Sequence, residues 1–597
     1  MFTDGLLPSL ASRLPSELVS LLPSNVSDAL SRTTLEQFFS NTSDKSNLSL
    51  ALTTLLSLTV ARYTYKRLTD ISLADVRGPG DGVNDEDVGG ASWMAGDIPT
   101  LFTDTTGTLG ARWADAYGAV CKLRAQIGTK NALLVSDPAA LRHIMQSEHA
   151  EKYIRAPEWY AMADLLAGEC IGSVEGDVHR RHRKGIRPAF GVPETRALLP
   201  VFNGVANKLC EKWDTLISLD TSEAPILNVA EWISKAALDA FGEVALDYQF
   251  GGLDNTPTEL AQAMPTVLLE TFGTPSPGQL AALSLLQYVP MGLIRWILNS
   301  APVGGRLDHV RNTNNVSQRI LLELIEDRKR MMKEGGGGKR DIMSHILRAG
   351  LNEDPTAKLS DDEIVAELRF LLLAGQETSA NTLAWALFEL SSRPHIQSEL
   401  RAEIRDAREK KAGKEFTAQD LQALPLLNAI IKETLRFDPV IQNMFREAAV
   451  DDVLPLSEPI KLKSGKVISD LPIPKGTKLY ISVAGYNMLP SVWGPDAQTW
   501  NPHRWLKQED EREGSNTLGM YANLMTFSAG NKGCIGWRFA VLQLQNLLAE
   551  LMDRFEFVEP KSGPKVVRAN CMSTQPMIKG EYEKGAQLPL VVKRAAA

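Results

Sequence analysis

A single cysteine in a glycine-rich segment has the surroundings of a metal ligand. Residues 527–536 read FSAGNKGCIG, and an apolar pattern with helical spacing follows them. Cys534 therefore lies at the expected start of a helix, where the helix dipole favours the thiolate form that binds metals. The glycines of the segment let the backbone turn tightly and approach a flat cofactor, with N–H groups beside the sulfur. Lys532 has the charge to contact an anionic edge of such a cofactor.

This segment resembles the haem-binding loop of cytochrome P450 enzymes, Phe-x-x-Gly-x-basic-x-Cys-x-Gly. The fixed positions are matched by Phe527, Gly530, Lys532, Cys534 and Gly536. The resemblance implies that Cys534 is the axial ligand of the iron of heme b, and that Phe527, Lys532 and Gly536 belong to the haem site. Taken alone, a free cysteine after a glycine-rich turn is also typical of a buried structural residue.

A second chemical signal lies in the middle of a long apolar helix. This helix begins with a capping box at residues 360–363 and is expected to end near residue 392. Its polar interruption, AGQETS, would be costly to bury for structural reasons alone. It resembles the oxygen-activating stretch of the P450 central helix, which implies that Gly375 leaves room for dioxygen while Glu377 and Thr378 deliver protons. The alternative is a helix kink at which Thr378 bonds back to a carbonyl.

Three charged residues further along match a structural motif of the same family. Glu433 and Arg436 are three residues apart in a helical stretch, which places them on one face. Arg504 follows where P450 enzymes supply a second arginine to this pair. The resemblance implies a buried lock that supports the cysteine loop, because two guanidinium groups can satisfy one carboxylate through forked hydrogen bonds.

An upstream basic helix is similar to the helix that binds the haem propionates in P450 enzymes. His179 takes the place of the usual tryptophan, and Arg183 lies one turn later, so both can donate to a carboxylate. Arg446, in a strand-like stretch after Pro439, is a third candidate contact. The alternative for the upstream helix is a solvated basic face, which suits its other basic residues.

Composition disfavours several classes of protein. The chain has 597 residues, a net charge of −8 and a pI of about 5.7, without a lysine and arginine block of the kind that binds nucleic acid. The five cysteines are scattered and form no Cys-x-x-Cys pair, which disfavours a zinc site and fits a reducing, cytosol-facing compartment. Nucleic acid is therefore not an expected partner.

The N-terminal part predicts a membrane anchor. Residues 48–61 are uncharged and mostly apolar, and a basic flank follows, so we expect a single-pass span within residues 47–67. The location implied is the endoplasmic reticulum membrane, with the catalytic domain in the cytosol. An interfacial or buried helix is the alternative, because the run is short for a bilayer. The other expected parts are an extension at residues 1–46, a hinge at residues 68–96 and one catalytic haem domain at residues 97–597.

The motifs follow one another in the order found in P450 enzymes, which implies a mainly α-helical fold with small β-sheets. The implied activity is that of a haem-thiolate monooxygenase, in which the thiolate favours O–O cleavage and one oxygen atom enters a hydrophobic small molecule. The chain carries no flavin or nicotinamide fingerprint, so the implied electron donor is a separate membrane-bound NADPH-cytochrome P450 reductase, with cytochrome b5 as a further candidate. The anchored form resembles fungal enzymes of secondary metabolism, and we favour a terpenoid substrate.

Two other functions stay open at this point. A haem-thiolate isomerase or peroxygenase would need no reductase, although such enzymes often lack the acid and alcohol pair that Glu377 and Thr378 supply. A non-catalytic haem-binding sensor would need neither that pair nor a large apolar cavity. Dependence on NADPH and a reductase separates the three functions.

Overall fold

The second of two compact units contains nearly all of the structure that can be described. These units are Met1–Ile71 and Ser72–Ala597. The computed structural model describes residue 57, residues 71–81 and residues 92–596, apart from residues 264–272, 297–305, 335–340, 352–353 and 507–517 and the positions 128, 150, 223, 274, 287, 291, 295 and 355. The expected extension and the expected anchor, except residue 57, lie outside this part of the chain. Within it, no helix is both long and apolar enough to cross a membrane.

Part of the segment expected to be a hinge is packed against the second unit. Leu73 and Val76 are buried in an apolar cluster together with residues of the sheet. The carboxylate of Asp75 accepts hydrogen bonds from the backbone N–H of Ser464, at 2.8 Å, and from its hydroxyl, at 2.6 Å. These contacts fix the chain at a point where its composition alone predicts flexibility.

The described chain is mainly α-helical, as the sequence predicts. Its first helices are α6 (Ile98–Thr103), α7 (Leu109–Tyr117), α8 (Pro138–Met145), α9 (Pro157–Ala167), α10 (Gly176–Ile186), α11 (Val192–Ala197), α12 (Leu199–Leu219), α13 (Val229–Leu246), α14 (Glu259–Ala263), α16 (Pro277–Leu286) and α18 (Arg306–Lys333). The later helices are α19 (Ile342–Gly350), α20 (Asp361–Ser391), α21 (Pro394–Lys410), α22 (Ala418–Gln422), α23 (Pro425–Phe437), α24 (Val483–Asn487), α25 (Pro490–Trp493) and α26 (Trp537–Arg554).

The strands form four small sheets. The largest has the order β1 (Val120–Leu123), β2 (Ala132–Val135), β8 (Lys478–Ser482), β5 (Asn443–Ala448) and β3 (Tyr153–Arg155). Only β2 and β8 pair in parallel in this sheet, and both are buried along their whole length, as is typical of parallel strands. The other sheets are β6 (Asp452–Lys461) with β7 (Val467–Ile473), β10 (Val566–Cys571) with β11 (Ser573–Ile578), and β4 (Ile226–Asn228), β12 (Pro589–Arg594) and β9 (Phe555–Val558).

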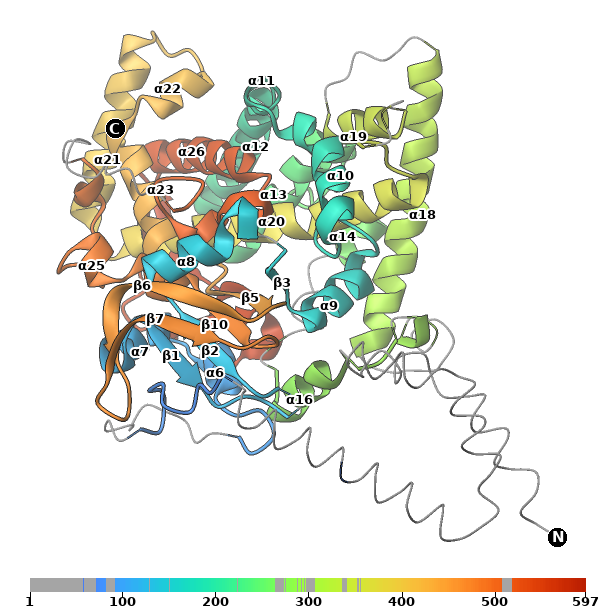
Figure 1. Ribbon diagram of the computed structural model, residues 1–597. Helices are drawn as coiled ribbons and strands as arrows, with labels where there is room; N and C mark the ends of the chain where they lie inside the picture. The colour runs from blue at the N-terminus through green and yellow to red at the C-terminus, as the bar shows by residue number, and fades with distance from the viewer. Residues whose placement is uncertain are drawn as a thin grey trace. The chain divides into compact units, whose positions relative to one another are not determined.

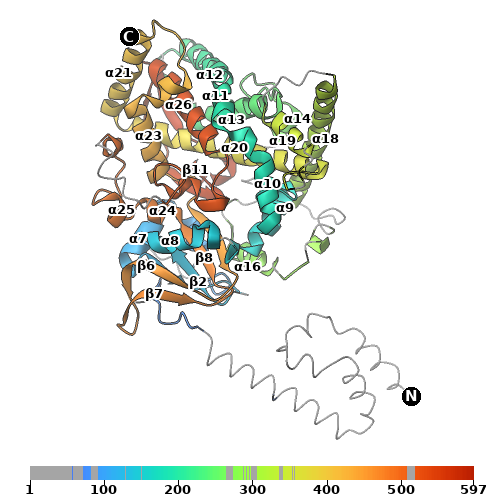
Figure 2. The same ribbon diagram turned by 45° about the horizontal axis from the view of Figure 1, so that its top comes forward.

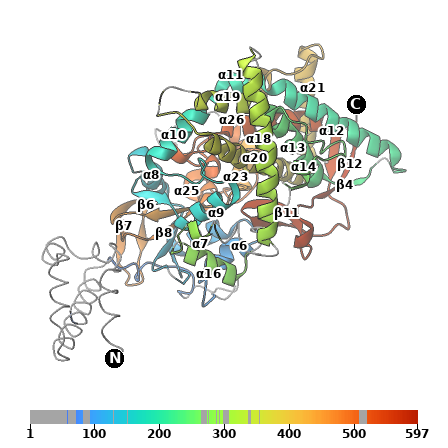
Figure 3. The ribbon, with the colours of Figure 1, turned by 90° about the vertical axis from the view of Figure 1, so that its right-hand side faces the viewer.

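Strands β1, β2, β5, β6 and β7 lie together at one side of the second unit (Figure 1), whereas β4 and β12 lie among the helices on the other side (Figure 3). Helix α20 runs through the helical part, which Figure 2 shows from another side, and it packs against α13, α23, α26 and β11. The long helix α18 lies along the edge of this part (Figure 3) and also contacts α20. The main apolar core therefore surrounds α20, with Leu372 of α20 and Trp213 of α12 among its fully buried side chains.

The beginning and end of α20 agree with the sequence analysis. The Ser360 side chain accepts a hydrogen bond from the N–H of Glu363, and the Glu363 carboxylate accepts one from the N–H of Ser360. This capping box satisfies N–H groups that a helix start leaves unpaired. The helix ends at Ser391, shortly before Pro394, which begins α21. The position of the polar interruption within one continuous helix is thereby fixed.

Candidate active site

The cysteine loop is held in a shape that its glycine Gly530 makes possible. Cys534 follows the short 3₁₀ helix Gly530–Lys532 and stands three residues before α26, and its N–H donates to the Phe527 carbonyl at 2.9 Å. Gly530 has a φ of +64°, and a Cβ on it would lie 1.9 Å from the carbonyl oxygen of Met145. A side chain at Gly530 would therefore be strained and would collide with backbone.

Cys534 combines exposed surface with protein close to its sulfur. The residue is exposed, yet burial raises the pKa of its thiol. The N–H of Gly536 and the guanidinium of Arg183 act in the opposite direction and favour the thiolate. The sequence suggested that the start of the helix stabilises the thiolate. In the structure burial has the larger effect on the pKa of Cys534 and favours the neutral thiol. A bound cation would restore the thiolate form.

One face of α20 also has accessible surface in the middle of an otherwise buried helix. Leu373, Ala374, Glu377 and Thr378 are half-buried, whereas most of their neighbours along the helix are fully buried. Their spacing of three and four residues places them on one side of the helix. Burial raises the pKa of Glu377, so this face is also surrounded by protein and borders an interior space.

The polar side chains in the middle of α20 bind different partners. Gln376 donates to the Ser234 hydroxyl on α13 at 2.8 Å. The Thr378 hydroxyl donates to the Ala374 carbonyl at 2.8 Å, which is the bond that the sequence analysis left open as an alternative. Its oxygen atom can still accept a hydrogen bond from a ligand.

Gly375 allows α13 and α20 to approach closely. A Cβ on Gly375 would lie 2.1 Å from Cε2 of Phe241 on α13. The room that the glycine leaves is therefore taken by the Phe241 ring. The expectation that Gly375 accommodates dioxygen finds no support in this contact, which explains the glycine by packing between helices.

Glu377 is the carboxylate of the interruption, and its partners come from β11. Its Oε1 accepts hydrogen bonds from the Ser573 hydroxyl, at 3.1 Å, and from the Gln575 amide. Burial raises the pKa of Glu377 to about 7, although both hydrogen bonds favour the charged form. The group therefore gains and loses a proton near neutral pH, as a proton-transfer residue must.

Two arginines face each other across the pairing of β3 and β5. Arg155 and Arg446 are direct partners in the register of these antiparallel strands. Like charges in such a position repel one another, and burial together with Arg155 lowers the pKa of Arg446 to about 10. Arg446 donates only to the backbone oxygen of Phe445 among the described residues. This part of the site therefore carries uncompensated positive charge.

The positive charge extends to α10 and to the cysteine loop. Lys532 pairs with Glu175, and burial lowers the pKa of Lys532 to about 8. Arg183 donates to the carbonyl of Gly533 at 2.8 Å. Burial and the neighbouring cations lower the pKa of His179 to about 3, so its ring is neutral, and its buried Nε2 has no hydrogen-bond partner in the described part of the chain.

These side chains form what we term the cationic cluster, in which four cations and the neutral His179 surround the single carboxylate of Glu175. The cations are Arg155, Arg183, Arg446 and Lys532. Arg155 and Glu175 were not predicted from the sequence. Glu175 gives a weak local signal, since it directly precedes the basic helix α10, whereas Arg155 gives none. An excess of buried positive charge with an unused hydrogen-bond donor is a binding site for an anionic group.

The predicted lock residues come together around one carboxylate. Arg436 binds Glu433 in a forked geometry, with N···O distances of 2.9 and 2.8 Å, and Arg504 Nε binds Oε1 at 3.0 Å. The indole of Trp505 and the N–H of Asn501 also donate to this carboxylate, at 2.9 and 2.7 Å. Five donated hydrogen bonds satisfy the buried charge, which is the condition for burying it without a large cost.

Asn487 connects this lock to the cysteine loop. The backbone carbonyl of Asn487 accepts a hydrogen bond from Arg436 at 2.7 Å, and its side-chain amide donates one to the Thr526 hydroxyl at 2.9 Å. The Thr526 hydroxyl in turn donates to the carbonyl of Leu435 at 2.6 Å. Thr526 directly precedes Phe527, so the lock and α23 position the start of the loop that carries Cys534.

Comparisons with known proteins agree with this geometry. A family profile described as Cytochrome P450 matches residues 111–579. The chain belongs to the cytochrome P450 family. It is 29% identical to cytochrome P450 monooxygenase 205 of Postia placenta over 518 residues, which cover 84% of this chain and 91% of that protein. It is 33% identical to monooxygenase 219 of the same fungus, over 78% of this chain and 86% of that protein. It is 30% identical to a ganoderic acid synthetase of Ganoderma lucidum, with the same two coverages.

Membership of this family implies a haem with a cysteine thiolate ligand, and the residues of the site fit that group. Haem carries two carboxylates, which match the unpaired positive charge of the cationic cluster and the free Nε2 of His179. Cys534 is an exposed cysteine in a loop whose glycine Gly530 fits closely against the backbone of Met145. The donor set is therefore that of a haem-thiolate site.

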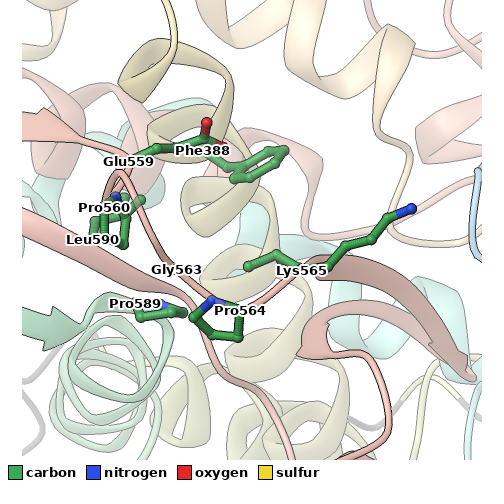
Figure 4. A pocket seen from close by; sticks show the side chains of 9 residues that line it. Phe388, Glu559, Pro560, Gly563, Pro564, Lys565, Pro589 and Leu590 are labelled. Carbon is green, nitrogen blue, oxygen red and sulfur yellow. The ribbon is translucent and has the colours of Figure 1, made fainter.

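A separate pocket of about 250 Å³ lies away from these residues (Figure 4). It is formed between the end of α20, the connection from β9 to β10, and β12. Its lining consists of Phe388, Glu559, Pro560, Gly563, Pro564, Lys565, Val566, Pro589 and Leu590. No residue of the cysteine loop or of the cationic cluster borders it, so it is not the catalytic pocket of this P450.

Proposed function

We propose that this P450 monooxygenase inserts one oxygen atom from dioxygen into a hydrophobic small molecule, with a terpenoid as the favoured class. One observation carries the proposal. Cys534 and one face of α20, with its titratable Glu377, keep accessible surface although burial raises the pKa of both groups. We infer that the two surfaces line one cavity, in which the haem and the substrate bind.

Each residue then has a defined task. Cys534 would bind the iron of heme b, the cationic cluster would bind its propionates, and Phe527 and Gly536 belong to the loop that holds Cys534. When bound, the haem-thiolate group supplies the oxidising chemistry. Glu377 holds and releases a proton near neutral pH, and the Thr378 oxygen accepts a hydrogen bond at the neighbouring position on the same face of α20. The apolar side chains of this face exclude water.

The substrate class is supported by the lining and by one relative. Leu373 and Ala374 contribute apolar surface from α20, which packs against α9. Leu166 and Ala167 of α9 are buried in two small apolar clusters, and Leu373 packs against the one with Leu166. Such a lining favours a ligand with little polar surface. A relative from Ganoderma lucidum carries the name ganoderic acid synthetase, which supports the preference for terpenoids.

We further propose a membrane-bound electron donor. The chain has no flavin or nicotinamide fingerprint, so electrons come from a separate NADPH-cytochrome P450 reductase, with cytochrome b5 as a second donor. The apolar run at residues 48–61, within the proposed anchor at 47–67, would place the chain on the endoplasmic reticulum membrane with its catalytic domain in the cytosol.

The activity is tested by reconstitution with a reductase, NADPH and labelled dioxygen. A panel of terpenoids, fatty acids and aromatic compounds is supplied, and the products are analysed by mass spectrometry. We expect a product that gains one labelled oxygen atom only when NADPH is present. Conversion without NADPH would instead identify an isomerase or a peroxygenase, and haem binding without any conversion would favour a sensor.

Replacement of Glu377 by glutamine is expected to remove a pH dependence of turnover. The pKa of Glu377 is raised to about 7, so the proton that it delivers is present below this pH and is lost above it. Turnover of the parent enzyme should therefore fall as the pH rises through about 7. Glu377→Gln should lower turnover by roughly 100-fold, in the range typical of a lost acid-base group, and flatten the profile. A variant profile that keeps its midpoint would contradict this role.

The same raised pKa predicts an effect on stability, measured by thermal unfolding of the holoenzyme. The carboxyl is protonated in the folded chain below about pH 7 but ionises at its ordinary, lower pKa when unfolded. Its contribution to the free energy of unfolding is therefore greatest at acidic pH and is lost as the pH rises through about 7. Glu377→Gln should remove this part of the pH dependence and raise the melting temperature at pH 8.

Replacement of Arg446 by glutamine is expected to weaken haem retention without destabilising the polypeptide. The change removes a charge-assisted donor to a propionate, which corresponds to roughly 10-fold to 100-fold in affinity. It also removes one of two repelling arginines, so the haem-free chain should unfold at the same or a higher temperature. The rate of haem transfer to a scavenger protein measures the first effect.

Arg180→Gln serves as the control for this experiment. Arg180 lies on α10 beside His179, but it is exposed and pairs with Asp177 at the surface. The control should retain haem as the parent does. If Arg446→Gln also retains haem as the parent does, the cationic cluster is not the propionate site.

A further inference from the structure

The β10–β11 hairpin reaches α20 at the position of Glu377. Ser573 and Gln575 are two residues apart on β11, so their side chains lie on one face of the strand. Glu377 and Asn381 are four residues apart on α20 and lie on one face of the helix. Asn381 donates to the Ser573 hydroxyl at 3.3 Å, and Ser573 donates to Glu377 Oε1 at 3.1 Å. A continuous chain of hydrogen bonds thus joins the strand to the helix.

The two donors on β11 bind one oxygen atom of the carboxylate. Gln575 donates to the same Oε1 that Ser573 contacts, and within the described residues no hydrogen bond to Oε2 is found. Oε1 is therefore held against the hairpin, while Glu377 as a whole retains accessible surface. This arrangement fixes the direction of the carboxyl group and leaves its second oxygen for the interior space.

The hairpin is itself rigidly placed. The Trp385 indole of α20 donates to the Thr574 carbonyl at 3.0 Å, and the Thr574 N–H donates to the Val440 carbonyl at 2.7 Å. The tip residue Met572 has a φ of +67°, which makes the turn between the strands tight. Ser573 and Gln575 are consequently presented to Glu377 by backbone that is anchored on both sides.

Charge around Glu377 is otherwise sparse. The titratable neighbour that interacts with it is Cys571 on β10, and burial raises the pKa of that thiol to about 12, so it stays neutral. The hydrogen bonds from Ser573 and Gln575 both lower the pKa of Glu377 and so oppose burial. Without these donors, burial would hold the carboxyl protonated to a higher pH.

We propose that Ser573 and Gln575 are positioning residues of the P450 reaction, which hold the Glu377 carboxyl in place and control its exchange of protons with the active site. This inference rests on the proposed function. It assigns to the C-terminal hairpin a task in proton transfer, in addition to any contact that the hairpin makes with substrate.

The test compares Gln575→Leu with Thr574→Val in the reconstituted holoenzyme. Leucine keeps most of the volume of glutamine but removes the donor to Oε1. Thr574 is the neighbouring residue on the opposite face of β11, and its buried hydroxyl has no hydrogen-bond partner in the described structure, so valine is a matched control. Turnover and the yield of product per NADPH are measured across pH, and thermal unfolding is followed in parallel.

Gln575→Leu is expected to shift the midpoint of the pH profile upward by about one unit, because one hydrogen bond to the charged form is lost. The yield of product per NADPH should fall several-fold, while Thr574→Val keeps the parent values. In a Glu377→Gln background, Gln575→Leu should have no further effect on the profile. An unchanged midpoint in Gln575→Leu overturns the proposal. If activity and the melting temperature also fall, the side chain has only a structural role.

A second measurement separates this inference from the proposed function. Infrared difference spectra of the holoenzyme, with Glu377→Gln as the blank, follow the titration of the Glu377 carboxyl without any turnover. The same upward shift in Gln575→Leu supports the positioning role even if no product is formed. If the parent forms no labelled product but Gln575→Leu still titrates at a higher pH than the parent, only the proposed function is refuted. Equal titration midpoints in the parent and in Gln575→Leu would refute the inference itself.

Discussion

The variant Cys534→Ser is expected to lose the haem-thiolate absorption spectrum and at least about three orders of magnitude of monooxygenase activity. The reason is chemical, because a thiolate donates electron density to the iron and a serine hydroxyl does not, which removes the assistance to O–O cleavage. Cys534 is exposed, and Gly536 and Arg183 favour the charged form of its thiol. The spectrum of the reduced protein with carbon monoxide is the direct measurement.

Cys210→Ser provides the same chemical change at a site without this role. Cys210 is buried in α12 within the main core, and burial raises the pKa of its thiol to about 12. This control should show a normal spectrum even if its melting temperature falls. An unchanged spectrum in Cys534→Ser would remove the central assignment of the haem ligand, and with it the proposed function.

The second large effect is expected at the lock, where Glu433→Gln should lower the free energy of unfolding by about 3–5 kcal/mol. Glutamine has nearly the same shape, but it leaves Arg436 and Arg504 as buried cations around a neutral group. Because Asn487 joins Arg436 to Thr526, the cysteine loop should loosen as well. Denaturant unfolding, and the fraction of purified protein that contains haem, measure the two consequences.

Glu399→Gln is the matched control for the lock. Glu399 binds His503 at 3.0 Å, one residue from Arg504, but both partners are largely exposed. An exposed pair contributes no more than about 1 kcal/mol, so this variant should unfold almost like the parent. Equal unfolding of Glu433→Gln and Glu399→Gln would show that the burial of the lock has little energetic effect.

Features that depend on residues close together in the chain could be predicted from the sequence. The capping box at Ser360 and Glu363 was predicted correctly because both partners lie in one helical turn, and propensity and capping chemistry act at that range. The forked pairing of Glu433 with Arg436 is also local, whereas its contact with Arg504 was inferred only from the resemblance to a family. The start of α26 after Cys534 followed from apolar spacing.

Contacts between segments far apart in the chain could not be predicted from local sequence patterns. The role of Gly375 toward dioxygen stays a prediction, but only the structure shows that a side chain there would meet the ring of Phe241, contributed by α13. The pairing of Arg155 with Arg446 depends on the register of β3 and β5, which no local pattern specifies. The pKa of Cys534 is raised for a similar reason, since burial by surrounding elements outweighs the helix start.

The chemistry proposed for this P450 can be inferred from residue types along the chain, namely a cysteine loop, a polar interruption in an apolar helix and a carboxylate with two arginines. These features depend on residue types at short spacings, where backbone geometry and side-chain chemistry suffice. The tertiary structure alone decided which groups act on one another, including the cationic cluster around Glu175 and the contact of Ser573 and Gln575 with Glu377. Such contacts depend on how whole helices and strands pack, because burial and charge at one residue are set by side chains hundreds of positions away.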